Sequence, residues 1–223
     1  MAIALDTAPH KEPQSLVEQA YLRLFGHHTC HFDLVEGVVF SPAQVRIIYL
    51  SEDIIRGIYD ALVFEAGEAW TVIMTTCGQL WGQRVTSSLK RELMTLDRPL
   101  DSLTVDHYIA LLEGYFSHHG WGRLTFDLAR AETLGVVQAK LQQSLFRQSL
   151  DHVEGPVDYM VAGMLLGLFG AISQQTLQAV EFLDARTHTS EFLISAPERM
   201  EPLVEFAQDG GDVHEALQRL GQT

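Results

Sequence analysis

The spacing of apolar positions along this chain changes several times between a helical and a strand period. From Ile54 to Leu80 the apolar residues keep close to one face of a 3.6-residue period, and Ser51 stands before them as an N-cap, so we predict a long helix here. Gly67, Gly78 and Gly82 lower the helix propensity of this segment, which favours a kink or two successive helices. The same spacing predicts helices over residues 13–25, 102–116, 157–180, 197–207 and 213–220.

Between these helices the pattern indicates strands. Residues 45–50 are rich in β-branched side chains, and Leu124, Phe126 and Leu128 alternate with polar residues. Residues 135–141 are also strand-like, and residues 179–183 and 190–194 predict a hairpin, although the boundary between helix and strand near Val180 is open. Strands and helices in this order predict an α+β fold, in which helices cover an antiparallel sheet.

Charge and length restrict the function. The 223 residues fit one domain with short terminal extensions, and a chain of this size buries about 70% of its surface without needing a disulfide or a metal. Lys and Arg total 15 against 29 Asp and Glu, a formal charge of −14, which repels phosphate backbones and anionic lipid. We therefore expect no nucleic-acid partner.

The chain shows no sign of secretion or of a membrane span. It has two cysteines in unlike contexts, Cys30 and Cys77, and its first residues lack the basic and long apolar regions of a signal peptide. The apolar run 159–172 is shorter than the roughly 20 residues that a span needs, so it predicts a buried helix. We expect a cytoplasmic protein that does not span a membrane.

Short motifs along the chain resemble a known family. They are Glu65-Ala-Gly67, Gly78-Gln-Leu-Trp-Gly82, Gly120-Trp121-Gly122, the glycines at 163 and 167, and Val180-Glu181. In order and spacing they resemble the vinyl-reductase-like (hydrocarbon-binding) domain family, over residues 45–194. That resemblance implies the fold shared with small-molecule sensor domains of the NO-signalling and Golgi-transport type and with TRAPP vesicle-tethering subunits. It divides the chain into an N-terminal tail and helix (1–40), a ligand-binding domain (41–196) and a C-terminal helical extension packed on that domain (197–223).

The resemblance also implies a ligand and a setting. Members of the family hold an apolar or tetrapyrrole-type molecule, and in photosynthetic organisms they are linked to chlorophyll metabolism and photosystem assembly. A photosynthetic protein complex is then an expected partner, which would place the chain at the periphery of a photosynthetic membrane. Many members also carry cysteines in the last hairpin that form a metal site with the acidic residue at its start. Glu181 matches that residue, but Asp184 and Ser190 stand at the cysteine positions, so we expect no metal.

Six residues form the candidate ligand-binding set: Glu65, Trp81, Tyr115, Trp121, Met164 and Phe169. Glu65 shares the apolar face of its helix with Ile54 and Ile58, so its charge must be paired, solvated or shifted in pKa. It is either a polar anchor of a pocket or a partner of an arginine such as Arg84 or Arg123. The aromatic members supply the surface that apolar pockets use, or they are simply core.

Two further motifs have more than one interpretation. Gly163-x-x-x-Gly167, with Met164 and Phe169 beside it, suits a homodimer interface, a wall of a ligand pocket or tight packing inside one chain. His27, His28, Cys30 and His31 could hold an ion or form an exposed polar loop, and their spacing matches no standard zinc pattern.

The sequence favours binding over catalysis. It contains no Gly-x-Ser-x-Gly motif, no glycine-rich phosphate loop and no dinucleotide fingerprint. A non-catalytic binding protein for an apolar or tetrapyrrole-type molecule, serving as a carrier or assembly factor in photosystem or chlorophyll biogenesis, is the first hypothesis. A ligand-free scaffold acting by protein contacts is the second, and a tetrapyrrole vinyl reductase with an external electron donor is the third.

Overall fold

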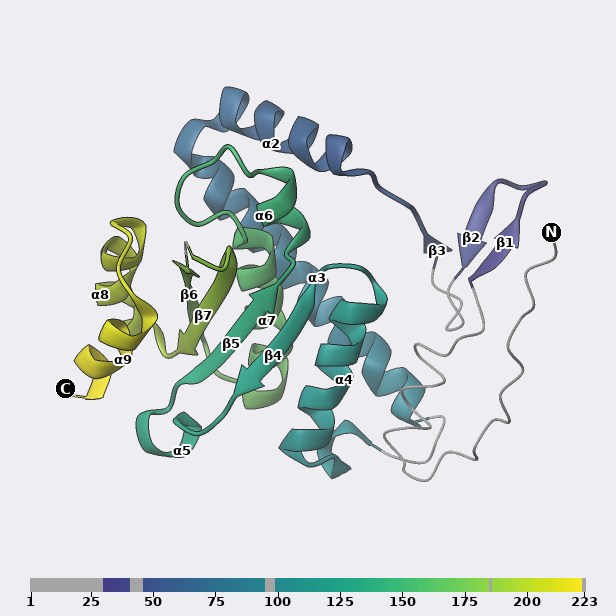
Figure 1. The fold of residues 1–223 in the computed structure, drawn as a ribbon. Helices are drawn as coiled ribbons and strands as arrows, with labels where there is room; N and C mark the ends of the chain where they lie inside the picture. Colours follow the sequence, from purple (N-terminus) through teal and green to yellow (C-terminus); the bar gives the residue numbers. More distant parts are fainter. Residues whose placement is uncertain (1–29, 41–45, 95–98, 185, 222–223) are drawn as a thin grey trace, which may run out of the picture. The chain divides into compact units, whose positions relative to one another are not determined.

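The computed structural model describes residues 30–40, 46–94, 99–184 and 186–221 (Figure 1). The chain divides into two compact units, Met1–Ile47 and Ile48–Thr223. The described part of the first unit is a small antiparallel sheet of β1 (His31–Asp33), β2 (Val38–Phe40) and β3 (Arg46–Ile47), in that order. All elements discussed below as candidate sites lie in the second unit.

The second unit begins with helices. Helix α2 (Glu52–Ala66) passes through a 3-10 turn (Gly67–Ala69) into α3 (Trp70–Met94), and a short turn (Leu100–Ser102) precedes α4 (Val105–His118). Strand β4 (Arg123–Asp127), α5 (Ala131–Leu134), β5 (Val137–Gln142) and α6 (Leu145–Ser149) follow. The chain continues with α7 (Tyr159–Ser173), β6 (Gln178–Asp184), β7 (Thr189–Ser195), α8 (Pro197–Gln208) and α9 (Val213–Gly221).

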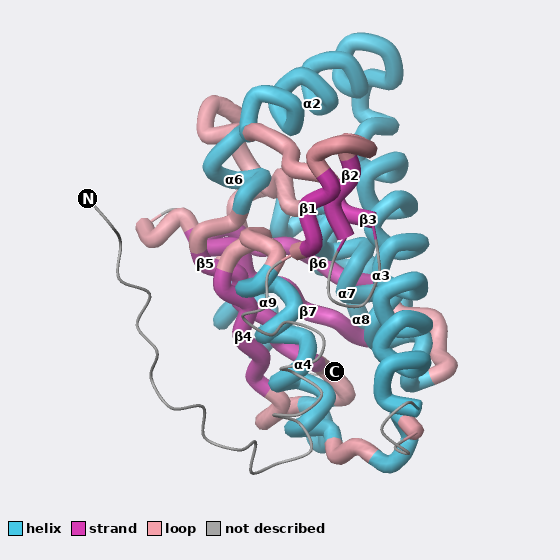
Figure 2. The backbone as a smooth tube through the Cα atoms, turned by 90° about the vertical axis from the view of Figure 1, so that its right-hand side faces the viewer, coloured by secondary structure: helices cyan, strands magenta, loops and turns pink. Residues whose placement is uncertain are grey.

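The four strands form one antiparallel sheet in the order β4-β5-β7-β6, with helices on both faces (Figures 1 and 2). Ala139, Phe192 and Glu181 are register neighbours on the face toward α7, while Leu193 and Val180 point to the opposite face. That opposite face packs on α8 and α9 through Phe182, Met200, Leu203 and Leu217. The predicted α+β fold, an antiparallel sheet covered by helices, is confirmed.

Helices α3 and α7 pack with their backbones in contact. A Cβ atom built on Gly163 would lie 2.8 Å from the carbonyl carbon of Thr75, and one on Gly167 would lie 2.8 Å from the backbone nitrogen of Gln83. Gly78 and Gly82 of α3 meet α7 as closely from the other side. Of the three interpretations of Gly163-x-x-x-Gly167, tight packing inside one chain is the one that the structure supports.

The β4 edge of the sheet is covered by a helix. Strand β4 pairs only with β5 in this sheet, and α4 packs along it. The Glu113 side chain of α4 accepts a hydrogen bond from the backbone nitrogen of Phe126 at 3.2 Å. A side chain thus occupies an amide that a further strand would otherwise use.

Two sequence expectations need correction, and a third is confirmed. The strand predicted over residues 45–50 ends at Ile47, because Ile48 and Leu50 are exposed and pair with no strand among the described residues. The helix predicted over 157–180 ends at Ser173, where Gln174 takes the left-handed conformation (φ 55°) and closes it. The break expected after α2 does occur, at Gly67 with φ 55°.

Helix α2 is packed differently from the sequence expectation. Its apolar residues were expected to face a core, but Ile55 is the only buried residue of α2, all fifteen residues of which are described. Ile54 and Ile58 are exposed, and so are Phe64 and Glu65. The reason is that α2 touches the rest of its unit mainly through the side that carries Ile55 and faces α6. None of the described helices is long and apolar enough to cross a bilayer.

Candidate functional site

A cluster of polar side chains is enclosed where α6, the start of α7 and the last hairpin meet. It consists of Ser144 and Arg147 from α6 and its N-cap, Asp158 before α7, Glu181 on β6 and Ser190 on β7. All five are buried, Asp158 and Ser190 completely. Ionised or polar groups enclosed in this way must satisfy one another.

Hydrogen bonds connect the whole cluster. Asp158 is bonded through Oδ1 to the Ser144 hydroxyl and through Oδ2 to the Ser190 hydroxyl, both at 2.5 Å. The Ser190 hydroxyl also lies 3.0 Å from Glu181 Oε1. Glu181 in turn accepts hydrogen bonds from the backbone nitrogens of Val157 and Asp158, at 3.4 and 2.8 Å. The hairpin is therefore fastened to the start of α7 by side chains.

The hydrogen bonds of Ser190 bear on the protonation of the two acids. Ser190 has one hydroxyl hydrogen, yet its oxygen is within hydrogen-bond distance of two carboxyl groups. Both contacts are satisfied at once when one carboxyl group is protonated and donates to the serine oxygen, while the serine donates to the other. We infer that Asp158 and Glu181 share one proton, which would leave a single negative charge there.

Arg147 balances that charge and fixes the adjoining loop. Its Nη2 lies 3.9 Å from Glu181 Oε1, and both side chains are almost fully buried. The guanidinium also donates to the carbonyl oxygen of Val153 at 3.1 Å and to that of Gly155. One arginine therefore joins the loop between α6 and α7 to strand β6, and the cluster with its shared proton is neutral.

Burial and charge raise the pKa values of both acids. The pKa of Glu181 is raised from 4.5 to about 8, mainly by burial and then by the neighbouring Asp158, while Arg147 opposes the shift. Burial likewise raises the pKa of Asp158, against the hydrogen bonds of Ser144 and Ser190. The two carboxyl groups titrate as a pair, so the proton belongs to the cluster.

We expect the stability of the protein to fall as the pH rises. Between about 4.5 and about 8 the folded chain keeps the shared proton while the unfolded chain has released it, so the free energy of unfolding decreases across this window. The expected decrease is a few kcal/mol, measurable by urea unfolding at a series of pH values.

Glu181→Gln is the matched variant for this experiment, since its amide stays neutral at every pH while keeping the shape of the carboxyl group. Its free energy of unfolding should decrease less steeply with pH than that of the natural chain over the same window. If the free energy of unfolding of Glu181→Gln fell with pH as steeply as that of the natural chain, groups other than Glu181 would be the cause of the pH dependence.

Aromatic side chains gather at a second place, where α3, α4 and the turn before β4 meet. The ring centroids of Trp81 and Trp121 are 4.5 Å apart, and Tyr115 lies 6.3 Å from Trp81. Phe146 of α6 lies 5.7 Å from Trp121, and His119 stacks on Tyr115 at 4.1 Å. Burial raises the pKa of Tyr115 to about 12, so its hydroxyl is neutral and able to hydrogen-bond.

The structure brings together half of the candidate set from the sequence. Trp81, Tyr115 and Trp121 are in one cluster, all half-buried. Phe169 lies apart from them, between Tyr108 and Phe126 at 6.5 and 5.5 Å.

The other two candidates are placed elsewhere. Met164 is fully buried in the contact of α7 with α3, where its backbone meets Gly78 and Gly82. Glu65 is exposed on α2, so solvent rather than a buried partner receives its charge. Among the ion pairs formed by described residues, none joins Glu65 to Arg84 or Arg123.

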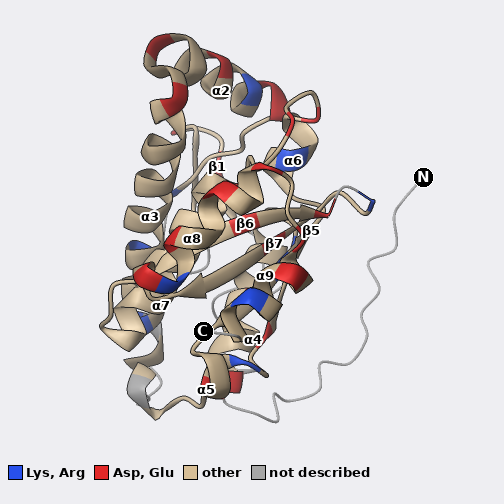
Figure 3. Ribbon diagram, turned by 90° about the vertical axis from the view of Figure 1, so that its left-hand side faces the viewer, with Lys and Arg blue, Asp and Glu red and all other residues tan. Residues whose placement is uncertain are grey.

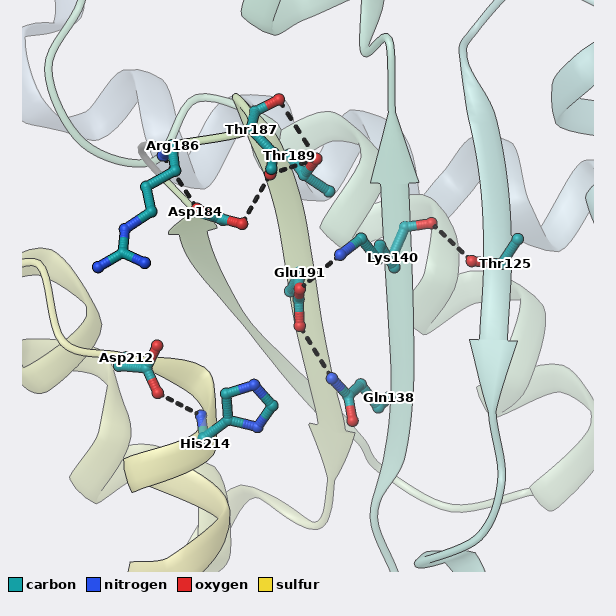
Figure 4. Close-up of polar contacts among 10 residues, drawn as sticks. All are labelled: Thr125, Gln138, Lys140, Asp184, Arg186, Thr187, Thr189, Glu191, Asp212 and His214. Atoms are coloured by element: carbon teal, nitrogen blue, oxygen red, sulfur yellow. Dashed lines mark hydrogen bonds and ion pairs between the residues drawn. The ribbon is translucent and has the colours of Figure 1, made fainter.

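The sheet face that packs on α8 and α9 also carries polar side chains, which lie beside a cleft. Glu191 accepts hydrogen bonds from Gln138 and Lys140 on the neighbouring strand, at 2.9 and 3.1 Å (Figure 4). Beside it lies a cleft of about 410 Å³ between the last hairpin and the α8–α9 turn. Two other carboxylates of the cleft, Asp184 and Asp212, accept hydrogen bonds from neighbouring backbone amides at 2.9 and 2.8 Å. The three acids thus hold the surrounding chain in place.

Asp184 and Ser190, which stand at the family's cysteine positions, point to different faces of the sheet. Ser190 is in the buried cluster with Glu181, while Asp184 lies on the face toward α8 and α9 (Figure 4). His27 and His28 lie outside the described residues, and His31 is exposed on β1. Within the described ranges no three His, Cys, Asp or Glu side chains are placed to share a metal ion.

The sequence interpretation missed Ser144, Arg147 and Asp158. They are far from Glu181 in sequence, and only the fold joins them. The sequence held one local signal for the pairing of Ser144 with Arg147. Ser144 is the N-cap of α6, three residues before Arg147, and its hydroxyl accepts a hydrogen bond from the Arg147 backbone nitrogen at 3.2 Å.

Comparison with known proteins identifies the fold. No family model matches the sequence, and no curated protein matches it. Among solved structures, the phenol-responsive sensory domain of the transcription activator PoxR, crystallised with phenol, matches with a TM-score of 0.61 and 20% identity. The match covers 94% of this chain and 99% of that domain. This chain has the fold of the PoxR sensory domain.

The fold implied by the sequence resemblance, one shared with small-molecule sensor domains, is therefore confirmed. A vinyl-4-reductase family protein from Methanocaldococcus jannaschii also matches, with a TM-score of 0.39 and 15% identity, over 65% of this chain and 87% of that one.

Proposed function

We propose that the second unit binds a small aromatic molecule at the cluster of Trp81, Tyr115 and Trp121. The observation that carries this proposal is the convergence of three half-buried aromatic side chains from α3, α4 and the turn before β4. Apolar pockets use such rings around a few placed polar groups. A flat aromatic guest would replace part of the contact that the two tryptophan rings now make with each other.

The polar group of the site is the Tyr115 hydroxyl. It stays neutral because burial raises its pKa to about 12, and the Trp81 indole nitrogen donates a hydrogen bond to it. A neutral hydroxyl can also donate to, or accept from, a hydroxyl on a guest molecule. This arrangement favours a small phenol-like ligand over a purely aliphatic one.

The shared fold supports the same ligand class. The PoxR sensory domain responds to phenol and was crystallised with it, and its fold extends over almost the whole of this chain. A narrower version of the proposal follows from the family resemblance. In it the ligand is a tetrapyrrole, and the protein acts in photosystem or chlorophyll biogenesis.

Tryptophan fluorescence tests the proposal. Phenol added to the purified chain should change the emission of Trp81 and Trp121 in a saturable way, and Trp121→Ala should weaken the apparent affinity at least tenfold, about 1.4 kcal/mol. Trp70→Phe is the matched control, because Trp70 lies in a separate group with Tyr59 and Tyr159. Its affinity should equal that of the natural chain.

Two results would contradict the proposal. One is the absence of a saturable change with phenol, indole or naphthalene; the other is unchanged binding by a folded Trp121→Ala variant. A chlorophyll precursor is titrated in parallel and followed by its own absorbance. A spectral shift that Trp121→Ala abolishes would select the tetrapyrrole version at the same site.

A further inference from the structure

Helix α2 carries an apolar stripe that no described element covers. At 100° per residue, Ile54, Gly57, Ile58, Ala61 and Phe64 fall on one side of this helix. All five are exposed, Phe64 at 85%. We call this set the α2 stripe. Scattered apolar residues are normal on a surface, but a continuous apolar stripe along a helix marks an interaction site.

The opposite side of α2 is anchored to the rest of its unit. Ile55 is buried there, and the Tyr59 ring meets Trp70 edge-on, with 4.9 Å between the ring centroids. Arg56 donates a hydrogen bond from Nε to the carbonyl oxygen of Ser149 in α6 at 3.1 Å. The α2 stripe is therefore presented outward by a helix that α6 and the start of α3 hold in place.

Gly57 lies in the middle of the stripe, and no contact within the described chain accounts for it. A Cβ atom built on this glycine would meet nothing within 4 Å, and glycine lowers the stability of a helix interior relative to alanine. Together with Ala61, one turn later, it leaves a low path beside Phe64 along which another backbone can approach. The shape of the stripe thus fits a second helix.

Acidic side chains border the stripe. Asp53 and Asp60 follow one edge of it, Glu65 lies at its carboxyl end, and all three are exposed (Figure 3). None of the ion pairs formed by described residues includes any of them. The one basic residue of α2, Arg56, already pairs with Asp151 at 3.6 Å. The apolar stripe therefore lies in a negative field that no neighbouring cation balances.

This charge pattern restricts what can cover the stripe. It repels an anionic lipid surface and a nucleic acid. A second α2 packed antiparallel would place Glu65 of each copy against the acidic first turn of the other, Glu52 and Asp53, so like charges would oppose each other. A helix whose apolar side is bordered by Lys or Arg matches both the stripe and its acids.

We propose that the α2 stripe docks a basic amphipathic helix of another protein. The large apolar side chains of that helix pack against Ile54, Ile58 and Phe64, and its Lys or Arg residues lie beside the acids that border the stripe. This surface shares no residue with the aromatic cluster proposed to bind a small molecule. Each of the two proposals can therefore fail without the other.

A synthetic peptide tests the docking. It has about 18 residues, with leucines along one side of a helix and lysines elsewhere, and its binding to the full chain is measured by fluorescence anisotropy. The natural chain should bind it saturably, with a dissociation constant of roughly 1–50 µM, and Ile58→Ser should raise that constant at least about tenfold. A peptide of the same composition with its leucines spread around the helix should bind at least about tenfold more weakly than the amphipathic one.

Val105→Ser is the matched control for Ile58→Ser. Val105 is 62% exposed on α4, a helix that lies at the other end of the unit from α2 in both views (Figures 1 and 2). The dissociation constant of this variant should stay within about twofold of the natural value.

Gly57→Gln tests the close approach of the two helices. Glutamine is a better helix former than glycine, and the open space around Gly57 accepts its side chain, so this variant should fold at least as well as the natural chain. The added side chain fills the low path, and the peptide should bind at least about fivefold more weakly. Circular dichroism confirms that the loss is measured on folded protein.

A pair of charge reversals tests the role of the acids. At about 50 mM salt, Asp60→Lys should weaken peptide binding at least about fivefold. Glu201→Lys changes the net charge by the same amount at an exposed position of α8, so its dissociation constant should stay within about twofold of the natural value. Equal effects of the two reversals would overturn the role of the acids, because they would show that only the net charge of the chain attracts the peptide.

Three results would overturn the docking itself. The first is equal binding of the two peptides, and the second is unchanged affinity in folded Ile58→Ser and Gly57→Gln variants. The third is a dimer of the natural chain, detected by sedimentation analysis, that excludes the peptide and that Ile58→Ser dissociates, because a second copy would then be the occupant of the stripe.

Discussion

Valine in place of Gly163 is expected to lower the free energy of unfolding by about 4 kcal/mol or more. The Cβ atom would fall on the backbone of Thr75 in α3, 2.8 Å from its carbonyl carbon, and neither helix backbone can move aside without breaking the contact between α3 and α7. This contact joins the two helices that back one face of the sheet. Urea unfolding followed by circular dichroism measures the loss.

Gly163→Ala keeps the experiment informative if the valine variant does not fold, because its single methyl group meets the same carbonyl and should cost about 2–4 kcal/mol. Gly170→Ala is the matched control in the same helix. Its Cβ would meet the carbonyl oxygen of Gln175 at 3.5 Å, an ordinary contact, so we expect no loss and a gain of up to about 1 kcal/mol. Equal losses at both positions would refute the close helix contact.

Replacing the buried Arg147 should lower the free energy of unfolding by a similar amount. In Arg147→Met the carbonyl oxygens of Val153 and Gly155 lose their donor, and the charge shared by Asp158 and Glu181 loses its counterion. Breaking a buried pair by removing one partner costs about 3–5 kcal/mol. We therefore expect a loss of that size at a pH of about 6.

The control for this variant is Arg130→Met. Arg130 pairs with Asp127 at 3.6 Å, and the two side chains are 41% and 52% exposed. Exposed pairs contribute about 0–1 kcal/mol, so the expected loss is below about 1 kcal/mol. If Arg147→Met were as stable as Arg130→Met, the polar cluster would not be holding the loop before α7.

Local patterns predicted much of this fold. The alternation around Phe126 corresponds to β4, the hairpin after Val180 corresponds to β6 and β7, and the glycine at position 67 separates α2 from α3. Periodicity alone did not show which apolar faces are covered. The spacing of apolar residues in α2 predicts that this side is part of the core, yet Ile58 is exposed. Burial depends on which elements pack together, and the spacing of apolar residues within one helix does not show that.

The sites were predictable only in part. Trp81 and Trp121 could be chosen as neighbours of glycines, and the fold places their rings 4.5 Å apart. Glu181 was recognised through the family resemblance, but its partners Arg147 and Asp158 lie 34 and 23 residues earlier in the chain. Contacts between residues so far apart are set by tertiary packing, and no sequence period encodes them.

The bond between Glu113 and the Phe126 amide bears on how this protein behaves at high concentration. An open strand edge recruits strands from other molecules, and fibrous aggregates grow in this way. Here α4 covers that edge, and a carboxylate occupies one of its amides at 3.2 Å. Partial unfolding that begins with α4 would therefore free the backbone amides of β4 to pair with a strand of another molecule.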